Sequence, residues 1–224
     1  MSNDSPNILV ASDLHKSYGR GPARNYVLRG LDLTVRRGEF LAVMGPSGCG
    51  KSTLLHVLGL ITPPDSGRIV LNGGEVPSAE RGRNLLRRRH IGLVFQRFNL
   101  IGVLSAADNV AIWLRVRGLS PNGRILPLLE ELGIAHLSDR KPSEMSVGEQ
   151  QRVAVARAIA HEPDLLLADE PTGSLDSANA AALLELLRDL NRRRGQTTVM
   201  ITHSPEAAAC ADRVAHMKDG RLLP

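Results

Sequence analysis

The sequence predicts an α/β protein with a mainly parallel sheet, and three observations point to this fold. Short apolar runs alternate with longer segments of helical periodicity, as in residues 40–44 and the stretch 51–60. A glycine-rich turn joins these two segments. The 224 residues with 42% hydrophobic content suit one large domain with a full core. Strands that alternate with helices form parallel sheets, because each helix returns the chain to the same end of the sheet.

The predicted strands are short runs, apolar or alternating, that turn residues bound. They cover residues 8–14, 31–35, 40–44, 68–71, 91–95, 165–168, 198–202 and 213–218. A glycine-bearing stretch at 19–22 separates the first two, and the prolines and glycine of 63–67 end the helix that follows the third.

The predicted helices follow the 3.6-residue period of their apolar side chains. They cover residues 51–60, 106–117, 126–132 and 148–160, with one more from about residue 178 that places Leu183, Leu184, Leu187 and Leu190 on one face. Because residues 97–157 are mostly helical, they are predicted to form an insert between two sheet-forming halves. No internal repeat is present in the sequence.

The formal net charge is +5, and two arginine-rich clusters at 81–89 and 192–194 supply much of it. These clusters are either solvated helix faces or surfaces weakly attracted to a membrane, where each nearby basic residue adds about 1 kcal/mol. Aromatic residues make up only 3% of the chain. This scarcity argues against binding of single-stranded nucleic acid, which usually relies on stacked aromatic rings.

The cysteines and the hydropathy pattern bear on the compartment. Cys49 and Cys210 are interpreted as free thiols of a reducing compartment, since a disulfide at Cys49 would obstruct the glycine-rich turn. No secretory leader opens the chain, and no apolar run approaches the roughly 18 residues that span a bilayer. We therefore expect that any role at a membrane requires a partner protein.

Residues 45–53 have the sequence GPSGCGKST, which fits the phosphate-binding pattern G-x-x-x-x-G-K-[ST] between a predicted strand and a predicted helix. Glycines allow several backbone N–H groups to converge on phosphate oxygens, and the helix N-terminus adds partial positive charge. Lys51 is expected to reach the terminal phosphates, and the Ser52 hydroxyl to ligate Mg²⁺. The chain is therefore predicted to bind ATP.

Two acidic residues follow the apolar run 165–168. A strand of a parallel sheet delivers them to the carboxyl edge of the sheet, where ligands of such sheets bind. Asp169 is predicted to hold Mg²⁺, and Glu170 to orient or deprotonate the attacking water. The pair alone is a weak signal, but together with the glycine-rich loop it predicts ATP hydrolysis.

From about residue 8 to residue 220, the chain resembles the nucleotide-binding subunits of ABC transporters. Residues 145–152, MSVGEQQR, resemble the family signature LSGGQ or LSGGE, and residues 169–176, DEPTGSLD, follow at the family's distance. The resemblance implies a P-loop RecA-like core with an N-terminal antiparallel β-subdomain and an inserted α-helical subdomain. The implied parts are 8–95 for the β-subdomain and phosphate loop, 97–157 for the helical subdomain, and 158–224 for the rest of the core.

The resemblance also implies roles for individual residues. Tyr18 resembles the residue that stacks on adenine, Gln96 the glutamine that touches Mg²⁺ and water, and His203 the histidine that contacts the γ-phosphate. The predicted catalytic residues are Glu170, His203, Lys51 and Gln96; the predicted Mg²⁺ ligands are Ser52, Gln96 and Asp169; the predicted ATP-binding residues are Tyr18, Gly45, Pro46, Ser47, Gly48, Cys49, Gly50, Lys51, Ser52, Thr53, Ser146, Gly148, Glu149 and Asp176.

In the family, two copies sandwich two ATP molecules head to tail, so the loop of one copy faces Ser146 and Gly148 of the other. A homodimer on ATP binding is therefore expected. Val147 departs from the signature, which usually has glycine there. Valine would be strained at a positive φ, but it fits in the ordinary conformation of a helix start, which we favour.

The motifs resemble in particular the branch that includes lipoprotein-releasing and macrolide-exporting ATPases. That branch implies a separate membrane permease, a peripheral location on the cytoplasmic face of the inner membrane, and work in export, lipoprotein release or mechanotransmission. Residues 97–114 would dock the permease; their apolar members Phe98, Ile101, Val103 and Trp113 would otherwise be plain core.

Two other hypotheses remain open. One is a soluble ABC protein that acts on DNA or ribosomes, which the basic charge favours, although such proteins usually carry two nucleotide domains or long inserts. The other is a scaffold that uses ATP only to dimerise, which Val147 leaves open and which Glu170 and His203 argue against. No nucleic-acid partner is expected under the transport hypothesis.

Overall fold

The computed structural model describes residues 5–223. The strands are β1 (Asn7–Tyr18), β2 (Asn25–Arg36), β3 (Phe40–Met44), β4 (Ser66–Leu71), β5 (Gly74–Glu75), β6 (Ile91–Val94), β7 (Leu165–Asp169), β8 (Thr197–Thr202), β9 (Arg213–Lys218) and β10 (Arg221–Leu222). The helices are α1 (Lys51–Leu58), α2 (Glu80–His90), α3 (Ala106–Val116), α4 (Ile125–Glu131), α5 (Val147–Ile159), α6 (Ser177–Arg194) and α7 (Pro205–Ala208). Short 3₁₀ helices cover Gly21–Ala23, Ala135–Leu137 and Pro142–Glu144. The α/β prediction with a mainly parallel sheet is confirmed.

The larger sheet has six strands in the order β10-β9-β3-β8-β7-β6. Every neighbouring pair from β9 to β6 is parallel, and only the short edge strand β10 is antiparallel. A second sheet of four strands, β2-β1-β4-β5, is antiparallel throughout. This is the RecA-like core with an antiparallel β-subdomain that the motifs implied.

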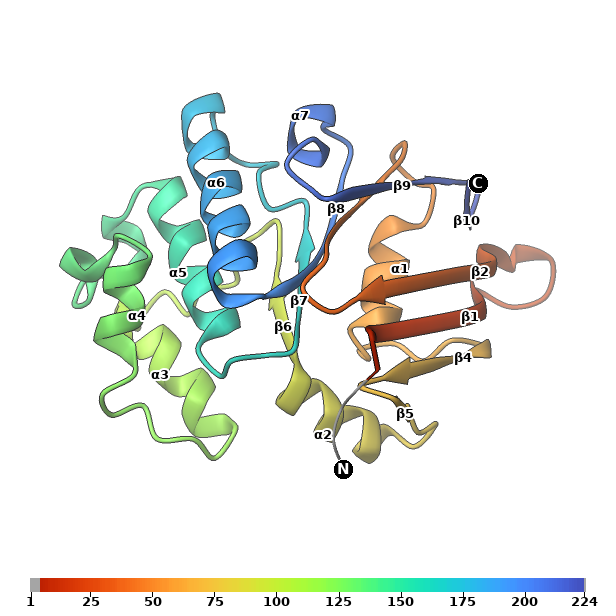
Figure 1. The fold of residues 1–224 in the computed structure, drawn as a ribbon, viewed down its shortest axis with the longest axis horizontal. Helices are drawn as coiled ribbons and strands as arrows, with labels where there is room; N and C mark the ends of the chain where they lie inside the picture. The colour runs from red at the N-terminus through yellow and green to blue at the C-terminus, as the bar shows by residue number, and fades with distance from the viewer. Residues whose placement is uncertain (1–4, 224) are drawn as a thin grey trace.

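The six-stranded sheet separates two hydrophobic cores. Because side chains alternate along a strand, Phe40 and Ala42 of β3 join one core, and Leu41 and Val43 join the other. The first core lies under helices α3 to α6, and the second lies between α1 and the antiparallel sheet. Figure 1 shows helices α3 to α6 on one side of the large sheet, and α1 with strands β1, β2 and β4 on the other. Burial on both faces explains why the central strands are continuous apolar runs.

Three differences from the predicted elements have physical causes. β1 and β2 extend well beyond 8–14 and 31–35, because shifts of register near Leu14 interrupt the two-residue alternation that marks a strand. Helix α2 was not predicted as a separate element, since its sequence is dominated by arginine and carries no apolar stripe. The last strand pair is completed by β10, which is too short for a periodic pattern.

The helices themselves begin and end with recognisable caps. The Ser105 and Asp176 side chains accept hydrogen bonds from the backbone N–H groups of Asp108 and Asn179, which starts α3 and α6. Gly195 ends α6 in the left-handed conformation at φ 63°. No helix within residues 5–223 is long and apolar enough to cross a membrane.

Candidate functional site

The carboxyl ends of the parallel strands meet at one edge of the six-stranded sheet. Met44 at the end of β3 pairs with Thr202 at the end of β8. Asp169 at the end of β7 pairs with Ile201 of β8, and β6 lies on the other side of β7. The residues that directly follow these strands are therefore brought together, although they are far apart in the sequence.

A cavity of about 530 Å³ lies at this edge, and we call it the nucleotide cavity. It is lined by Tyr18, Val27, Ser47, Gly48, Gly50, Lys51, Ser52, Thr53, Gln96, Glu170 and His203. All of these except Val27 were predicted as site residues from the sequence. Three predicted members of the loop, Gly45, Pro46 and Cys49, do not line it, and the Cys49 side chain is buried in the core.

The phosphate loop takes its shape from glycines that no other residue could replace without strain. Gly48 and Gly50 have φ of 77° and 106°, in the left-handed region. A Cβ on Gly45 would lie 2.2 Å from the carbonyl oxygen of Met217, so the loop packs directly against β9. Helix α1 begins at Lys51, directly after Gly50, and the free N–H groups of its first turn therefore face the cavity.

Lys51 is held within the curve of this loop. Its Nζ donates hydrogen bonds to the carbonyl oxygens of Gly45 at 2.8 Å and Pro46 at 3.0 Å. Only 7% of the residue is exposed, and no carboxylate of residues 5–223 lies within 4.0 Å of its ammonium group. A buried cation without a paired anion favours an anionic ligand such as phosphate.

Ser52 and Asp169 form the acidic corner of the site. The Ser52 hydroxyl lies close enough to the Asp169 carboxyl group to lower its pKa. Burial raises the pKa of Asp169, and the nearby Glu170 raises it further, while His56, Ser52 and Lys51 lower it. Hydroxyl and carboxylate oxygens suit Mg²⁺, which usually takes one or two protein ligands beside phosphate oxygens. The donor set therefore fits Mg²⁺, and residues 5–223 contain no cluster of three or more His, Cys, Asp or Glu residues that would indicate another kind of metal site.

Glu170 and His203 face each other across the ends of β7 and β8. His203 Nδ1 lies 2.9 Å from Glu170 Oε1, and the His203 backbone N–H lies 3.4 Å from Glu170 Oε2. Glu170 has φ of 45°, a left-handed conformation that is unfavourable for glutamate. Its backbone N–H donates to the Ile201 carbonyl oxygen at 3.0 Å, which holds this conformation. Strained residues of this kind concentrate at functional sites.

Gln96 and Tyr18 lie at the two sides of the cavity. Gln96 follows β6, and its amide packs so closely on Gly173 that a Cβ there would lie 3.0 Å from Nε2. Tyr18 ends β1 with 45% of its surface exposed, and the Lys16 ammonium lies 5.6 Å from the centre of its ring. An exposed aromatic ring beside a phosphate site offers a face for a nucleotide base.

The predicted signature residues lie elsewhere, at the start of α5. Ser146 caps this helix: its Oγ accepts from the Glu149 N–H at 3.3 Å, and Glu149 Oε2 accepts from the Ser146 N–H at 2.7 Å. Val147 is the first residue of α5, without a positive φ, and 44% of it is exposed. The strain that a positive φ would impose on valine is therefore absent.

Gly148 allows the start of α5 to approach the start of α6. A Cβ on Gly148 would lie 2.6 Å from Asn179 Oδ1, and Asn179 Nδ2 donates to Asp176 Oδ2 at 2.7 Å. We call Ser146, Gly148, Asp176 and Asn179 the signature corner. Asn179 was missed in the sequence, where only its position three residues after a helix-capping aspartate pointed to it. None of these residues lines the nucleotide cavity of the same chain.

A sequence model of the ABC transporter family matches residues 28–173. The chain is 46% identical to the lipoprotein-releasing system ATP-binding protein LolD of Bordetella avium, over 96% of each chain. It is 45% identical to the macrolide export ATP-binding/permease protein MacB of Chlorobium luteolum, over 96% of this chain and 33% of that longer protein.

Solved structures agree with these sequence comparisons. A dimeric ATP-binding cassette in a post-hydrolysis state with ADP and phosphate is similar with a TM-score of 0.88 and 35% identity, over 96% of this chain and 97% of that one. The cbiO1 protein of Clostridium perfringens, part of an ABC transporter complex, is similar with a TM-score of 0.89 and 31% identity, over 98% and 88%. The chain therefore belongs to the ABC transporter family, as an ATP-binding cassette.

Proposed function

We propose that this ATPase subunit of an ABC transporter binds Mg-ATP in the nucleotide cavity and couples its hydrolysis to a membrane permease that releases lipoproteins or exports a related substrate. The observation that carries the proposal is the gathering of Lys51, Ser52, Gln96, Glu170 and His203 around one cavity. In this proposal the loop N–H groups and Lys51 hold the phosphates, and the Tyr18 ring stacks on adenine.

Hydrolysis requires a water molecule in line with the γ-phosphorus. The Glu170 carboxylate accepts a proton from this water while the new P–O bond forms and the bond to the ADP oxygen breaks. His203, which hydrogen-bonds to Glu170 at 2.9 Å, orients the carboxylate and faces the same space. Mg²⁺, held by Ser52 and Asp169 with Gln96 nearby, would neutralise charge on the phosphate oxygens. The products are ADP and phosphate.

The signature corner is proposed to act on the ATP of a second copy. Ser146, Gly148 and Asp176 do not line the cavity of their own chain, yet Ser146 begins a 13-residue helix whose free N–H groups suit a phosphate. Glu149, predicted to touch the nucleotide, uses its carboxylate to cap Ser146. We therefore propose that Glu149 shapes the corner and that Ser146 and Gly148 make the contact.

Residues 97–114 are proposed as the docking surface for the permease. A groove of about 470 Å³ beside them is lined by Gln96, Phe98, Val147 and Ser174, among others. Ile101 and Val103 are exposed, Val103 to 78%, which suits a partner surface. Trp113 is instead half-buried and packs against the guanidinium of Arg117, whose carbon lies 4.1 Å from the ring centre.

The backbone of this docking surface is held rigidly. The Arg157 guanidinium donates to the carbonyl oxygens of Asn99 at 2.5 Å and Phe98 at 2.7 Å. The buried Asn109 side chain accepts from the Ile101 N–H at 2.8 Å and donates to the Ser105 carbonyl oxygen at 2.9 Å. A groove that joins Gln96 to Val147 can pass a displacement of the permease to both parts of the composite site.

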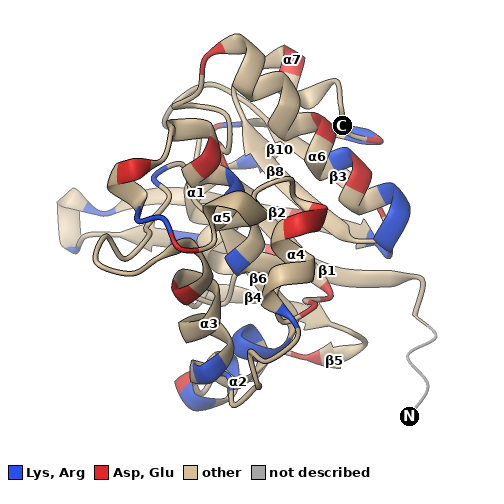
Figure 2. Cartoon of the chain, turned by 90° about the vertical axis from the view of Figure 1, so that its left-hand side faces the viewer, with Lys and Arg blue, Asp and Glu red and all other residues tan. Residues whose placement is uncertain are grey.

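The location that follows from this function is peripheral, on the cytoplasmic face of the inner membrane. Basic residues gather along α2 and at the end of α6, at separate places on the surface (Figure 2). They offer weak attraction to anionic lipid, which would support the permease rather than replace it.

The test combines phosphate release with co-purification. We expect purified protein to release phosphate from Mg-ATP well above a Glu170→Gln control, and to co-purify with a permease from detergent-solubilised membranes. Absence of activity above that control, with or without the permease, would support the scaffold hypothesis. Co-purification with DNA or ribosomes in place of a permease would support the soluble alternative.

A further inference from the structure

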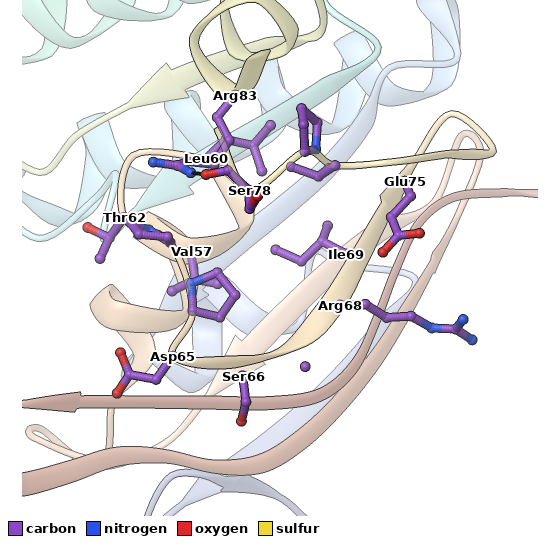
Figure 3. Close-up of a pocket in the computed structure, with 15 residues that line it drawn as sticks. Val57, Leu60, Thr62, Asp65, Ser66, Arg68, Ile69, Glu75, Ser78 and Arg83 are labelled. Atoms are coloured by element: carbon purple, nitrogen blue, oxygen red, sulfur yellow. Dashed lines mark hydrogen bonds between the residues drawn. The ribbon is translucent and has the colours of Figure 1, made fainter. Parts of the chain in front are cut away.

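A second cavity lies away from the nucleotide cavity, at the far end of α1. It has a volume of about 520 Å³, within the range of roughly 300–1,000 Å³ that small-molecule sites occupy. The residues after α1, the start of β4 and the loop between β5 and α2 surround it. No residue lines both cavities. Figure 3 shows Arg83 and Ser78 at one end of this cavity and Arg68 and Glu75 at the other.

The floor of this cavity is apolar. Val57, Leu60 and Ile69 are almost fully buried and line it, while prolines 63, 64 and 77 form part of its walls. Because these three side chains are already shielded from water, an apolar ligand would gain free energy mainly by covering the exposed prolines 63 and 77 and the partly buried Pro64.

Arg83 is the exception in this apolar setting. It is only 9% exposed, and its Nε is buried with no hydrogen-bond partner in residues 5–223. Its Nη1 donates to the Ser78 carbonyl oxygen, and no described carboxylate lies within 4.0 Å of the guanidinium. Buried arginines are normally paired with an acid, since burial of an uncompensated charge is unfavourable.

The neighbours of Arg83 do not compensate its charge. Arg87 lies one helical turn further along α2; burial and then the positive charge of Arg83 lower the pKa of Arg87, and the opposing effect of Glu80 is smaller. The Asp65 carboxylate lines the cavity but is engaged with Lys16 at 2.9 Å and with the Ser17 hydroxyl at 2.6 Å. Glu75 is exposed at the opposite end of the cavity. An anion next to the Arg83 guanidinium would neutralise its charge and so remove the repulsion with Arg87.

We propose that this cavity binds a small amphipathic carboxylate, with its apolar body between the proline walls, over the floor of Val57, Leu60 and Ile69, and its carboxylate on Arg83. The head group pairs with the guanidinium of Arg83, which lines the cavity, and neutralises its charge. Because α1 carries the phosphate loop at its first residue and this cavity at its last turn, the ligand contacts the same helix as the nucleotide, from the other end. The site does not depend on the residues proposed for ATP hydrolysis.

The test uses decanoate as the probe and decanol as its uncharged counterpart of equal chain length, both well below the concentrations at which they form micelles. Titration calorimetry with the full chain should show saturable 1:1 binding of decanoate and at least about tenfold weaker binding of decanol, because a hydrogen bond to a charged group contributes about that factor. Methyl NMR should place the probe: signals of Val57 and Ile69 should shift, and that of Ile112 in α3 should not.

Variants of α2 separate a specific contact from general charge attraction. Arg83→Gln should weaken decanoate binding about tenfold or more and leave decanol binding unchanged, while Arg83→Lys should weaken it less. Arg81→Gln removes an equal charge from an exposed residue of the same helix and should have no effect. Equal binding of decanoate and decanol by the unaltered protein would overturn the proposal, even if Arg83→Gln fails to fold. The absence of saturable binding, or equal losses in Arg81→Gln and Arg83→Gln, would overturn it as well.

Discussion

The nucleotide cavity and the signature corner differ in how complete they are within one chain. The cavity gathers residues from β1, β2, the phosphate loop and the start of α1, and from the segments that follow β6, β7 and β8. The signature corner holds only a capped helix start and the Asp176–Asn179 pair, and it faces none of the cavity residues of its own chain. One region is a binding site by itself, whereas the other is a surface that gains a role only when a second copy is present.

The two regions also differ in whether their charged side chains have partners within the chain. Lys51 is buried without an acidic partner and Asp169 has a raised pKa, so the cavity holds uncompensated charge that a ligand would relieve. In the signature corner, Asp176 has a lowered pKa because hydrogen bonds from Asn179 satisfy it, and next to the corner Glu149 has a lowered pKa because of hydrogen bonds from Ser146. The acidic side chains in and beside the corner therefore have their hydrogen bonds without a ligand. Four changes can test this contrast between the regions.

The largest effect is expected for Glu170→Gln, which removes the proton acceptor and keeps the shape of the side chain. The rate of phosphate release should fall by about 10²–10⁴-fold, the usual contribution of a general base. Because ATP then persists, the variant should elute as a dimer with Mg-ATP in size-exclusion chromatography with light scattering. The matched control is Glu185→Gln on the exposed face of α6, which should behave as the unaltered protein. A strictly monomeric Glu170→Gln variant would contradict the two-chain site.

Lys51→Ala should act on the cavity alone. Loss of a charge-assisted contact costs about 1.5–3 kcal/mol, so ATP affinity of the monomer should fall more than tenfold. Fluorescent-nucleotide titration measures this affinity, and Lys141→Ala, an exposed lysine outside the cavity, is the control. Unchanged affinity in Lys51→Ala would show that the loop is not the nucleotide site.

The parts of the fold that the sequence predicted are those that local patterns specify. Residues 40–44 and 213–218 were predicted with the bounds that β3 and β9 have, because both are bounded by clear turn residues. Glycine spacing predicted the phosphate loop for the same reason. β1 and β2 were underestimated, since shifts of register between them are a property of strand pairing and leave no periodic trace.

Features that depend on contacts between distant segments could not be predicted from the sequence. The left-handed φ of Glu170, its contact with His203 and the closeness of Gly148 to Asn179 all arise from packing of separate elements. The unpaired buried Arg83 belongs to the same class, because its isolation depends on where α2 lies against β4. Among the apolar residues of 97–114, burial separates Trp113 from the exposed Val103 only once α3 is placed.

Gly148→Ala tests the signature corner without touching the cavity. The new methyl group would displace the Asn179 amide and break its hydrogen bond to Asp176, a loss of about 1 kcal/mol. Phosphate release should fall roughly fivefold, while ATP affinity of the monomer stays the same. Gly102→Ala, whose Cβ would meet no atom within 4 Å, is the control. Equal losses of monomer affinity and of turnover would show that the two regions are not separable.

The smallest effect is expected for Val147→Gly, which restores the usual family residue. Val147 occupies an exposed first position of α5 in an ordinary helical conformation. Removal of its side chain therefore relieves no backbone strain. Glycine should lower the free energy of unfolding by about 0.5–1 kcal/mol through added backbone freedom in the unfolded chain. Phosphate release should change by less than about threefold, as for exposed substitutions that break no contact. Thermal unfolding and phosphate assays on the same preparation measure both quantities. A gain of tenfold or more in turnover would show that valine impairs the composite site, and that the second chain approaches this position more closely than the conformation of α5 alone requires.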